Sequence, residues 1–201
     1  TCGFYGVLRS GGTNASETVG VSGGGTIGLA SAAAAIGMGA RVIVVDPLQA
    51  RRDVALKLGA DEVVDATQDP VARIRELTGG RGADLVIEAA GHDASLANVF
   101  EYAREEGRVS MIGINIGRKI NVELGKIQIK NLVVKGCIGS PGVWPAAIRF
   151  LERTGIDLSP IQTHTFALEN AVEAFDLGKD ARKAIKITLT SGGNLARGTP
   201  H

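Results

Sequence analysis

The sequence predicts an α/β fold, in which a doubly wound parallel sheet of six strands is followed by a short C-terminal appendage. Short apolar runs rich in Val and Ile alternate with segments of helical length, as in successive strand–helix–strand units. The 28 glycines fall between these runs without a fixed period, which suits tight α/β turns rather than a collagen-like repeat. With 201 residues, the chain can form one well-cored domain and a small addition.

The first half of the chain contains three expected strands. The run at residues 41–46 includes four consecutive β-branched residues, which is typical of a strand that a parallel sheet buries on both faces. The Ala-rich helix before this run closes at Gly39, and the amphipathic helix after it closes at Gly59. In order, we expect a strand at residues 18–22, a helix at 27–38, a strand at 41–46, a helix at 49–58 and a strand at 62–64.

The second half continues the alternation. Pro70 suits the first turn of a helix that ends at the pair Gly79-Gly80, and Asp93 is placed to cap the N-terminus of the next helix. We expect helices at residues 70–77, 93–104 and 144–153, and strands at 84–89, 108–112 and 132–138.

The pattern changes after residue 155. A strand at 161–167, a helix at 168–177 and a last strand at 184–190 are expected there, in a segment too short to bury a core of its own. The tail at 191–201 is polar and contains Gly and Pro, so we expect it to be disordered.

A glycine-rich turn links the first expected strand to the first expected helix. Gly23 permits the tight turn, Gly25 lets the backbone approach a pyrophosphate, and Gly28 lets the helix pack closely on the strand. Thr26 and Ile27 complete the turn, and the helix N-terminus offers free N–H groups to phosphates. This placement predicts a Rossmann-type dinucleotide site.

An acidic residue ends the second expected strand. Asp46 follows Gly28 by 18 residues, where a carboxylate can accept hydrogen bonds from both hydroxyls of an adenosine ribose and would repel a 2′-phosphate. Arg51 and Arg52 lie nearby and weaken this preference, because arginine can accommodate the extra phosphate. The sequence therefore favours NAD over NADP.

Composition excludes several other classes of protein. The net charge is +1 and aromatic residues make up 4%, so no nucleic-acid partner is expected. No apolar run reaches the length of a membrane helix, and no signal peptide is evident. Cys2 and Cys137 form no paired motif, which favours a cytoplasmic setting. The chain begins at Thr1 rather than Met, as a fragment of a longer protein would.

The glycine-rich turn admits three other interpretations. The glycines could be ordinary turn residues and Asp46 a strand-end cap. A methyltransferase also has a glycine-rich first turn and a following acidic residue, but the expected fourth strand lacks the polar, Pro-rich exit of amino-methylating enzymes. A short-chain dehydrogenase needs a Tyr followed four residues later by Lys, whereas Tyr102 is followed by Glu106 and Tyr5 by Arg9.

Several segments in order resemble the medium-chain dehydrogenase/reductase family, especially its zinc-dependent alcohol, sorbitol and threonine dehydrogenases. The resemblance covers residues 1–190, and its segments are specific only in combination. They are residues 2–6 (CGFYG), 23–28 (GGGTIG), 57–61 (KLGAD), 79–84 (GGRGAD), 88–91 (EAAG), 107–109 (GRV), 163–171 (THTFALENA) and 173–175 (EAF).

The resemblance implies cofactor contacts at matching positions. It places Asp46 on the ribose and Arg51 at the adenosine end. It places Ile27 under the nicotinamide and Lys186 on the pyrophosphate, although Lys186 could equally be a solvated strand-edge residue. The remaining implied contacts are Ala90 and Gly91 at the adenine-side ribose, Ile112, Gly113 and Ile114 beside the nicotinamide, and Ile138 in a second such segment.

The resemblance also implies a partner domain that this chain does not contain. In the family, a GroES-like catalytic domain precedes this portion and supplies the zinc ligands and the proton relay, so zinc is expected only there. Cys2 matches a zinc ligand only in a register that needs a gap before the glycine turn. The histidines lack metal-ligand spacing, and His164 is expected to be structural. The implied divisions are a connecting helix at 1–17, the NAD-binding domain at 18–155, a returning segment at 156–190 and the tail.

Two functions follow as hypotheses. The first is the NAD(H)-binding portion of an alcohol dehydrogenase that acts on a small alcohol or polyol. The second is a non-catalytic NAD-binding module or truncated product. A homodimer or homotetramer is expected, since the apolar strand at 132–138 would be an exposed sheet edge in a monomer.

Overall fold

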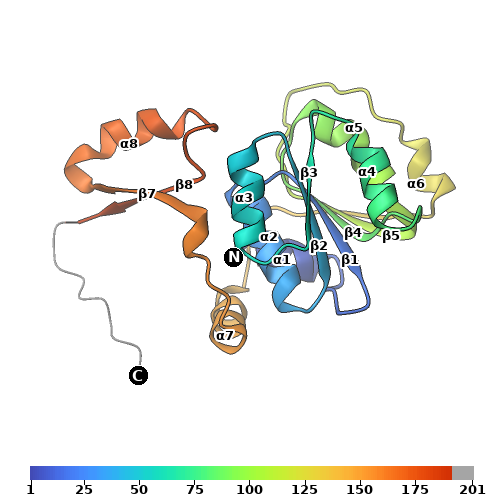
Figure 1. Ribbon diagram of the computed structural model, residues 1–201, viewed down its shortest axis with the longest axis horizontal. Coiled ribbons are helices and arrows are strands. Elements are labelled where there is room, and N and C mark those ends of the chain that lie inside the picture. The colour runs from blue at the N-terminus through green and yellow to red at the C-terminus, as the bar shows by residue number, and fades with distance from the viewer. Residues whose placement is uncertain (192–201) are drawn as a thin grey trace. The chain divides into compact units, whose positions relative to one another are not determined.

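The computed structural model describes residues 1–191 and divides them into two units, of which the second begins at Ser159. The first unit is built on a six-stranded parallel sheet in the order β3-β2-β1-β4-β5-β6 (Figure 1). This is the doubly wound α/β sheet that the sequence predicts. The strands are β1 (Thr18–Ser22), β2 (Arg41–Asp46), β3 (Glu62–Asp65), β4 (Ala83–Glu88), β5 (Ala103–Met111) and β6 (Val133–Gly136).

The helices of the first unit form two groups, which Figure 1 shows on opposite faces of the sheet. Helix α2 packs against α1 and α3, whereas α5 packs against α4 and α6. Gly3 allows the close approach of α1 to α2, because a Cβ there would lie 2.5 Å from the Ser31 nitrogen. The helices are α1 (Cys2–Arg9), α2 (Thr26–Gly37), α3 (Gln49–Lys57), α4 (Pro70–Leu77), α5 (Asp93–Tyr102), α6 (Gly125–Ile129) and α7 (Trp144–Thr154).

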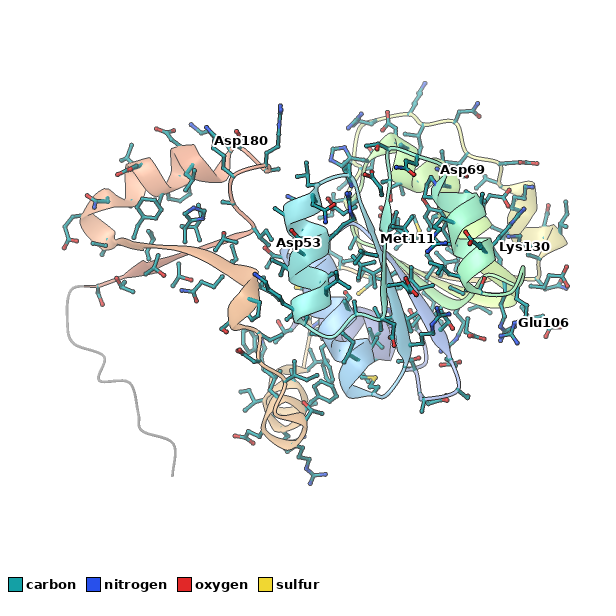
Figure 2. All side chains as sticks on the ribbon, viewed as in Figure 1. Asp53, Asp69, Glu106, Met111, Lys130 and Asp180 are labelled. Atoms are coloured by element: carbon teal, nitrogen blue, oxygen red, sulfur yellow. The ribbon has the colours of Figure 1, made fainter. Side chains whose placement is uncertain are left out.

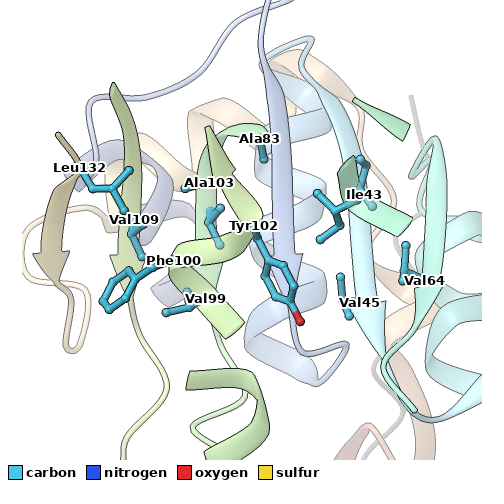
Figure 3. Packing of buried hydrophobic residues seen from close by; sticks show 12 residues of the cluster. Ile43, Val45, Val64, Ala83, Val99, Phe100, Tyr102, Ala103, Val109 and Leu132 are labelled. Atoms are coloured by element: carbon cyan, nitrogen blue, oxygen red, sulfur yellow. The ribbon is translucent and has the colours of Figure 1, made fainter. Parts of the chain in front are cut away.

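One cluster of the buried hydrophobic core lies between the sheet and the α4–α5 layer. Ile43, Val86 and Val109 from neighbouring strands are fully buried there, together with Val99 and Tyr102 of α5 (Figure 3). Every residue of β4 is buried, as expected for a central strand covered on both faces. The continuous apolar runs of the sequence are therefore explained by their place in the sheet.

The end of α5 differs from the prediction. The helix stops at Tyr102 instead of residue 104, and β5 begins at once at Ala103 instead of residue 108. The Lys130 ammonium explains the early stop, since it donates hydrogen bonds to the carbonyls of Phe100 (2.8 Å) and Ala103 (2.9 Å). The register of β5 against β4 shifts near this start, and Glu106 and Lys130 both lie at this end of the sheet (Figure 2).

Two local predictions are also corrected. Asp93 is the first residue of α5 and His92 is the N-cap, without a side-chain capping bond. The Asp93 carboxylate instead pairs with Arg118 at 3.0 Å. The short helix α6 was not predicted.

The described part of the second unit, residues 159–191, contains a two-stranded parallel sheet and one α-helix. Its elements are β7 (Gln162–Ala167), α8 (Ala171–Gly178) and β8 (Lys186–Thr190), with short 3-10 turns at Ser159–Ile161 and Leu168–Asn170. The expected last strand thus begins at Lys186 rather than residue 184. The tail was expected to be disordered from residue 191 onward. Residues 192–201 lie outside the described part of the chain. Within residues 1–191, no helix is long and apolar enough to cross a membrane.

Candidate functional site

The candidate site lies at the carboxyl ends of the central strands. The strand order reverses between β1 and β4, and open α/β sheets bind ligands at such a switch point. The glycine turn leaves β1 and the 89–91 loop leaves β4, and the two touch: a Cβ on Gly23 would lie 2.9 Å from the Ala90 nitrogen. The turn and the loop therefore form one surface.

The glycine turn is shaped by close contacts at two of its glycines. Gly23 has a φ of +103°, and its N–H donates to the Val45 carbonyl at 2.8 Å. A Cβ on Gly28 would lie 1.8 Å from the Gly23 carbonyl oxygen, so no other residue fits there. Gly25 is different, because only the Arg51 guanidinium, at 3.9 Å, would meet its Cβ. The space beside Gly25 is thus open to a ligand.

Gly25 is also the N-cap of α2, in extended backbone. Thr26 and Ile27 form the first turn of this helix. The first N–H groups of any α-helix lie outside its internal hydrogen-bond pattern. The Ile27 side chain is 40% exposed. This end of α2 therefore combines backbone donors for an anion with an uncovered apolar side chain.

Asp46, the last residue of β2, lies beneath this turn and is 2% exposed. Its Oδ2 accepts the Gly24 N–H at 2.7 Å, and its Oδ1 accepts the Leu48 N–H at 2.8 Å. The Arg51 guanidinium lies 3.4 Å from Oδ2. Oδ2 thus accepts from two donors, whereas Oδ1 accepts from one and has a second lone pair for a hydroxyl.

The two neighbouring arginines have different surroundings. The Arg52 guanidinium donates to the Asp46 carbonyl (2.7 Å), to Gln49 (2.6 Å) and to the Asp65 carboxylate (3.0 Å). It is buried and ties the ends of β2 and β3 together, which is a structural role. Arg51 is the arginine that lies against the Asp46 carboxylate. Only Arg51 is thus placed to influence a ligand beside Asp46.

The loops after β4 and β5 pack directly on each other. Gly91 has a φ of +64°, and its Cβ would lie 2.9 Å from the Ile114 carbonyl oxygen. A Cβ on Gly113 would lie 2.3 Å from the Gly91 nitrogen. The structure therefore brings the pair Ala90-Gly91 together with the pair Gly113-Ile114, which lies more than 20 residues later in the sequence.

The apolar residues expected beside a nicotinamide differ in exposure. Ile112 is 8% exposed, whereas Ile114 is 65% exposed. Ile138 follows β6 and is 74% exposed. Lys186 belongs to the second unit, where it is the exposed first residue of β8.

Glu88 is the buried residue at this site to which the sequence assigned no role. It ends β4, is 0% exposed, and accepts hydrogen bonds from the loop that follows it. Its neighbour Ser95 also contacts Ser22, the residue before Gly23, at 2.8 Å between the hydroxyl oxygens. Burial raises the pKa of Tyr102 to about 12. The sequence signals for Glu88 were its acidic side chain near the end of an apolar strand and its place in the 88–91 segment of the family resemblance.

Metal ligands do not gather in the described chain. No group of three or more His, Cys, Asp or Glu side chains among residues 1–191 could hold a metal ion. Cys2 lies on α1, with its Sγ 4.0 Å from the Ser140 hydroxyl. His164 contacts the Thr163 hydroxyl at 3.0 Å and stacks near Phe166. The residues present therefore do not make a zinc site.

Comparison with known proteins gives consistent matches. A family model described as zinc-binding dehydrogenase matches residues 26–153. The chain is 35% identical over 176 residues to an erythritol/L-threitol dehydrogenase of Mycolicibacterium smegmatis, covering 86% of this chain and 48% of that protein. It is 36% identical over 162 residues to an L-threonine 3-dehydrogenase of Bacillus velezensis, covering 78% of this chain and 46% of that protein.

A solved structure matches as well. An Escherichia coli CFT073 protein, described as a short chain alcohol dehydrogenase complexed with NADH, has a TM-score of 0.82 at 25% identity, covering 92% of this chain and 56% of that one. The chain thus spans about half the length of the relatives it matches.

Proposed function

Because the chain belongs to the zinc-type medium-chain dehydrogenase family, we propose that it is the NAD(H)-binding portion of an alcohol dehydrogenase. The observation that carries this proposal is the buried Asp46 carboxylate, held by two backbone N–H groups beneath an open glycine turn. A structural neighbour that was solved with NADH supports the choice of a nicotinamide cofactor. When bound, the cofactor accepts or returns a hydride, and the chain's residues hold it in place.

Each part of the site has a proposed role. Gly23, Gly25 and Gly28, with the N-terminus of α2 at Thr26, would hold the pyrophosphate. The pyrophosphate contact of Lys186 stays an expectation from the resemblance, because Lys186 belongs to the second unit. Asp46 would accept from the adenosine ribose, and Arg51 would flank the adenosine. The remaining proposed contacts are Ala90 and Gly91 at that ribose, and Ile27, Ile112, Gly113, Ile114 and Ile138 around the nicotinamide.

Asp46→Ala tests the ribose assignment. We expect NADH binding to weaken by about 1–3 kcal/mol, because ribose hydroxyls lose their acceptor. The ratio of the Kd for NADPH to the Kd for NADH should fall, because the repulsive carboxylate is gone and Arg51 loses this partner. Calorimetric titration with both cofactors measures the ratio, and Asp53→Ala, an exposed carboxylate on α3, is the control. Equal losses for both cofactors would refute the assignment.

The whole protein's reaction lies partly outside this chain. We propose hydride transfer between NAD and a small alcohol or polyol, because relatives are described as dehydrogenases of erythritol, L-threitol and L-threonine. The described residues do not make a zinc site, so we derive no step through zinc from this chain. We propose that zinc is held by a domain outside these residues.

The alternative is a non-catalytic NAD-binding module. It draws support from the lack of a metal-ligand cluster among residues 1–191. Two observations discriminate: NADH formation from NAD and small polyols by this chain, and a reading frame before Thr1 that encodes a Cys and a His–Glu pair of zinc-ligand type. Binding without turnover, in a gene that lacks this upstream region, favours the module.

We further propose self-association through the edge of the sheet and a cytoplasmic setting. Strand β6 is an edge strand, and Val133 on it is 50% exposed. An apolar edge of this kind pairs readily with another strand, so a homodimer, or a homotetramer built from it, is proposed. Both cysteines are free thiols, which fits a reducing compartment.

A further inference from the structure

The Glu88 carboxylate is buried at the end of β4 without a basic partner among its described contacts. Its Oε1 accepts three hydrogen bonds, from the Ala90 N–H (3.1 Å), the Gly91 N–H (2.9 Å) and the Ser95 hydroxyl (2.7 Å). Its Oε2 is buried and has no hydrogen-bond partner. Burying a carboxylate in this way is costly, so its retention needs a physical reason.

The same residue also holds the loop after β5. The Glu88 carbonyl accepts the N–H groups of Ile112 (2.8 Å) and Gly113 (2.9 Å). The Glu88 side chain also lies close to Gly113, because a Cβ on Gly113 would be 2.3 Å from Oε2. Glu88 therefore touches the loop at Ala90 and Gly91 through Oε1 and the loop at Gly113 through Oε2 and its carbonyl.

A chain of hydroxyl groups leads to this carboxylate. The Ser22 and Ser95 hydroxyl oxygens are 2.8 Å apart. Because the Ser95 hydroxyl has one proton, which it donates to Glu88, it must accept from Ser22. Successive donors of this kind polarise one another. The network thus joins the end of β1, just before Gly23, to the ends of β4 and β5.

We propose that Glu88 is a positioning residue for the nicotinamide half of the cofactor. By holding Gly91 on Oε1 and supporting Gly113 at Oε2, it fixes the segment 112–114, whose backbone and side chains would meet the nicotinamide. The inference rests on the proposed function, and it adds a buried carboxylate that acts through two glycines without touching the ligand.

Strand β4 offers a matched control at its other end. Asp84 is a second buried carboxylate on the same strand, and it accepts the Thr18 N–H at 2.8 Å and the Arg104 guanidinium at 2.6 Å. Those contacts lie at the amino ends of the strands, away from the proposed site. Asp84→Asn therefore disturbs a buried carboxylate without disturbing the cofactor loops.

The test compares NADH with ADP-ribose, which lacks the nicotinamide, in wild type, Glu88→Gln and Asp84→Asn. Glutamine keeps an oxygen for Ala90 and Gly91, but its amide group replaces Oε2 against Gly113. We expect the Kd for NADH to rise at least about fivefold, the effect of one hydrogen bond, while the Kd for ADP-ribose stays within about twofold. The fluorescence enhancement of bound NADH should fall as well. Asp84→Asn should change neither Kd.

Other outcomes overturn the inference. If Glu88→Gln weakens the binding of NADH and ADP-ribose equally, Glu88 has a general structural role. If NADH binding is unchanged, Glu88 does not position the nicotinamide half of the cofactor. If Glu88→Gln fails to fold, Ser95→Ala removes one donor to Oε1. It should weaken NADH binding more than ADP-ribose binding, because Gly91, which Oε1 holds, packs on Gly113 and Ile114; equal weakening would overturn the inference. A wild-type chain that binds neither ligand overturns the proposed function itself, which is a distinct result.

Discussion

Alanine at Gly28 should destabilise the fold, whereas alanine at Gly25 should leave its stability almost unchanged, although both glycines belong to one turn. At Gly28 the added Cβ would lie 1.8 Å from the Gly23 carbonyl oxygen, whereas ordinary contacts begin at 3.4 Å. The backbone must therefore move by about 1.6 Å, and overpacking of this kind costs about 1–3 kcal/mol. At about 2–4 °C per kcal/mol, we expect the melting temperature to fall by roughly 2–12 °C.

Gly25→Ala should leave the fold intact. The nearest heavy atom would be the Arg51 guanidinium at 3.9 Å, and φ is −75°, which alanine adopts without strain. The poorer N-cap and the stiffer unfolded chain oppose each other, so the change in unfolding free energy should stay within about 1 kcal/mol. The methyl group would instead occupy the space proposed for the pyrophosphate.

Cofactor affinity separates the two effects. Losing one charge-assisted hydrogen bond to phosphate costs about 1.5–3 kcal/mol, so the Kd of Gly25→Ala for NADH should rise by roughly 10- to 100-fold. Thermal melts and calorimetric titration of both variants provide the measurements. A Gly25→Ala protein that binds NADH as tightly as wild type would refute the claim that the pyrophosphate lies on this turn.

Two further predictions concern stability and association. The pKa of Asp84 lies below its ordinary 3.8, because burial raises it but the Thr18 N–H and the Arg104 guanidinium lower it by more. The unfolded chain therefore binds this proton at a higher pH, and the stability from Asp84 is lost as pH falls below about 4. Asp84→Asn should make the free energy of unfolding depend less on pH in that range. The same pH dependence in the variant and in wild type would contradict this account. Val133→Lys places a charge on the exposed β6 edge and should convert a dimer to a monomer in light scattering, whereas a wild-type chain that is already monomeric at high concentration would rule out edge pairing.

The sequence predicts the sheet well because its signals are local. Four β-branched residues in β2 and the glycines that close the helices mark elements without reference to distant parts of the chain. The start of β5 was missed for the opposite reason. The Lys130 ammonium ends α5 from about thirty residues away, and no local pattern records such a contact.

The candidate site shows the same limit. Gly23, Gly28 and Asp46 follow from a turn and a strand end that are close in sequence. The contact between Gly91 and Gly113, and the Glu88 carboxylate that supports it, depend on two strands that meet only in the folded sheet. A buried acid within an apolar strand was the visible trace of that arrangement.

Titration of the 201-residue chain with NADH tests the central proposal most directly. Saturable binding should appear in calorimetry, and at a hundredfold excess over Kd the free energy of unfolding should rise by about 2.7 kcal/mol. Asp46→Ala in the same titration should reduce both signals. Neither saturable heat nor a thermal shift at millimolar NADH would contradict the proposal that this turn and this carboxylate hold a nicotinamide cofactor.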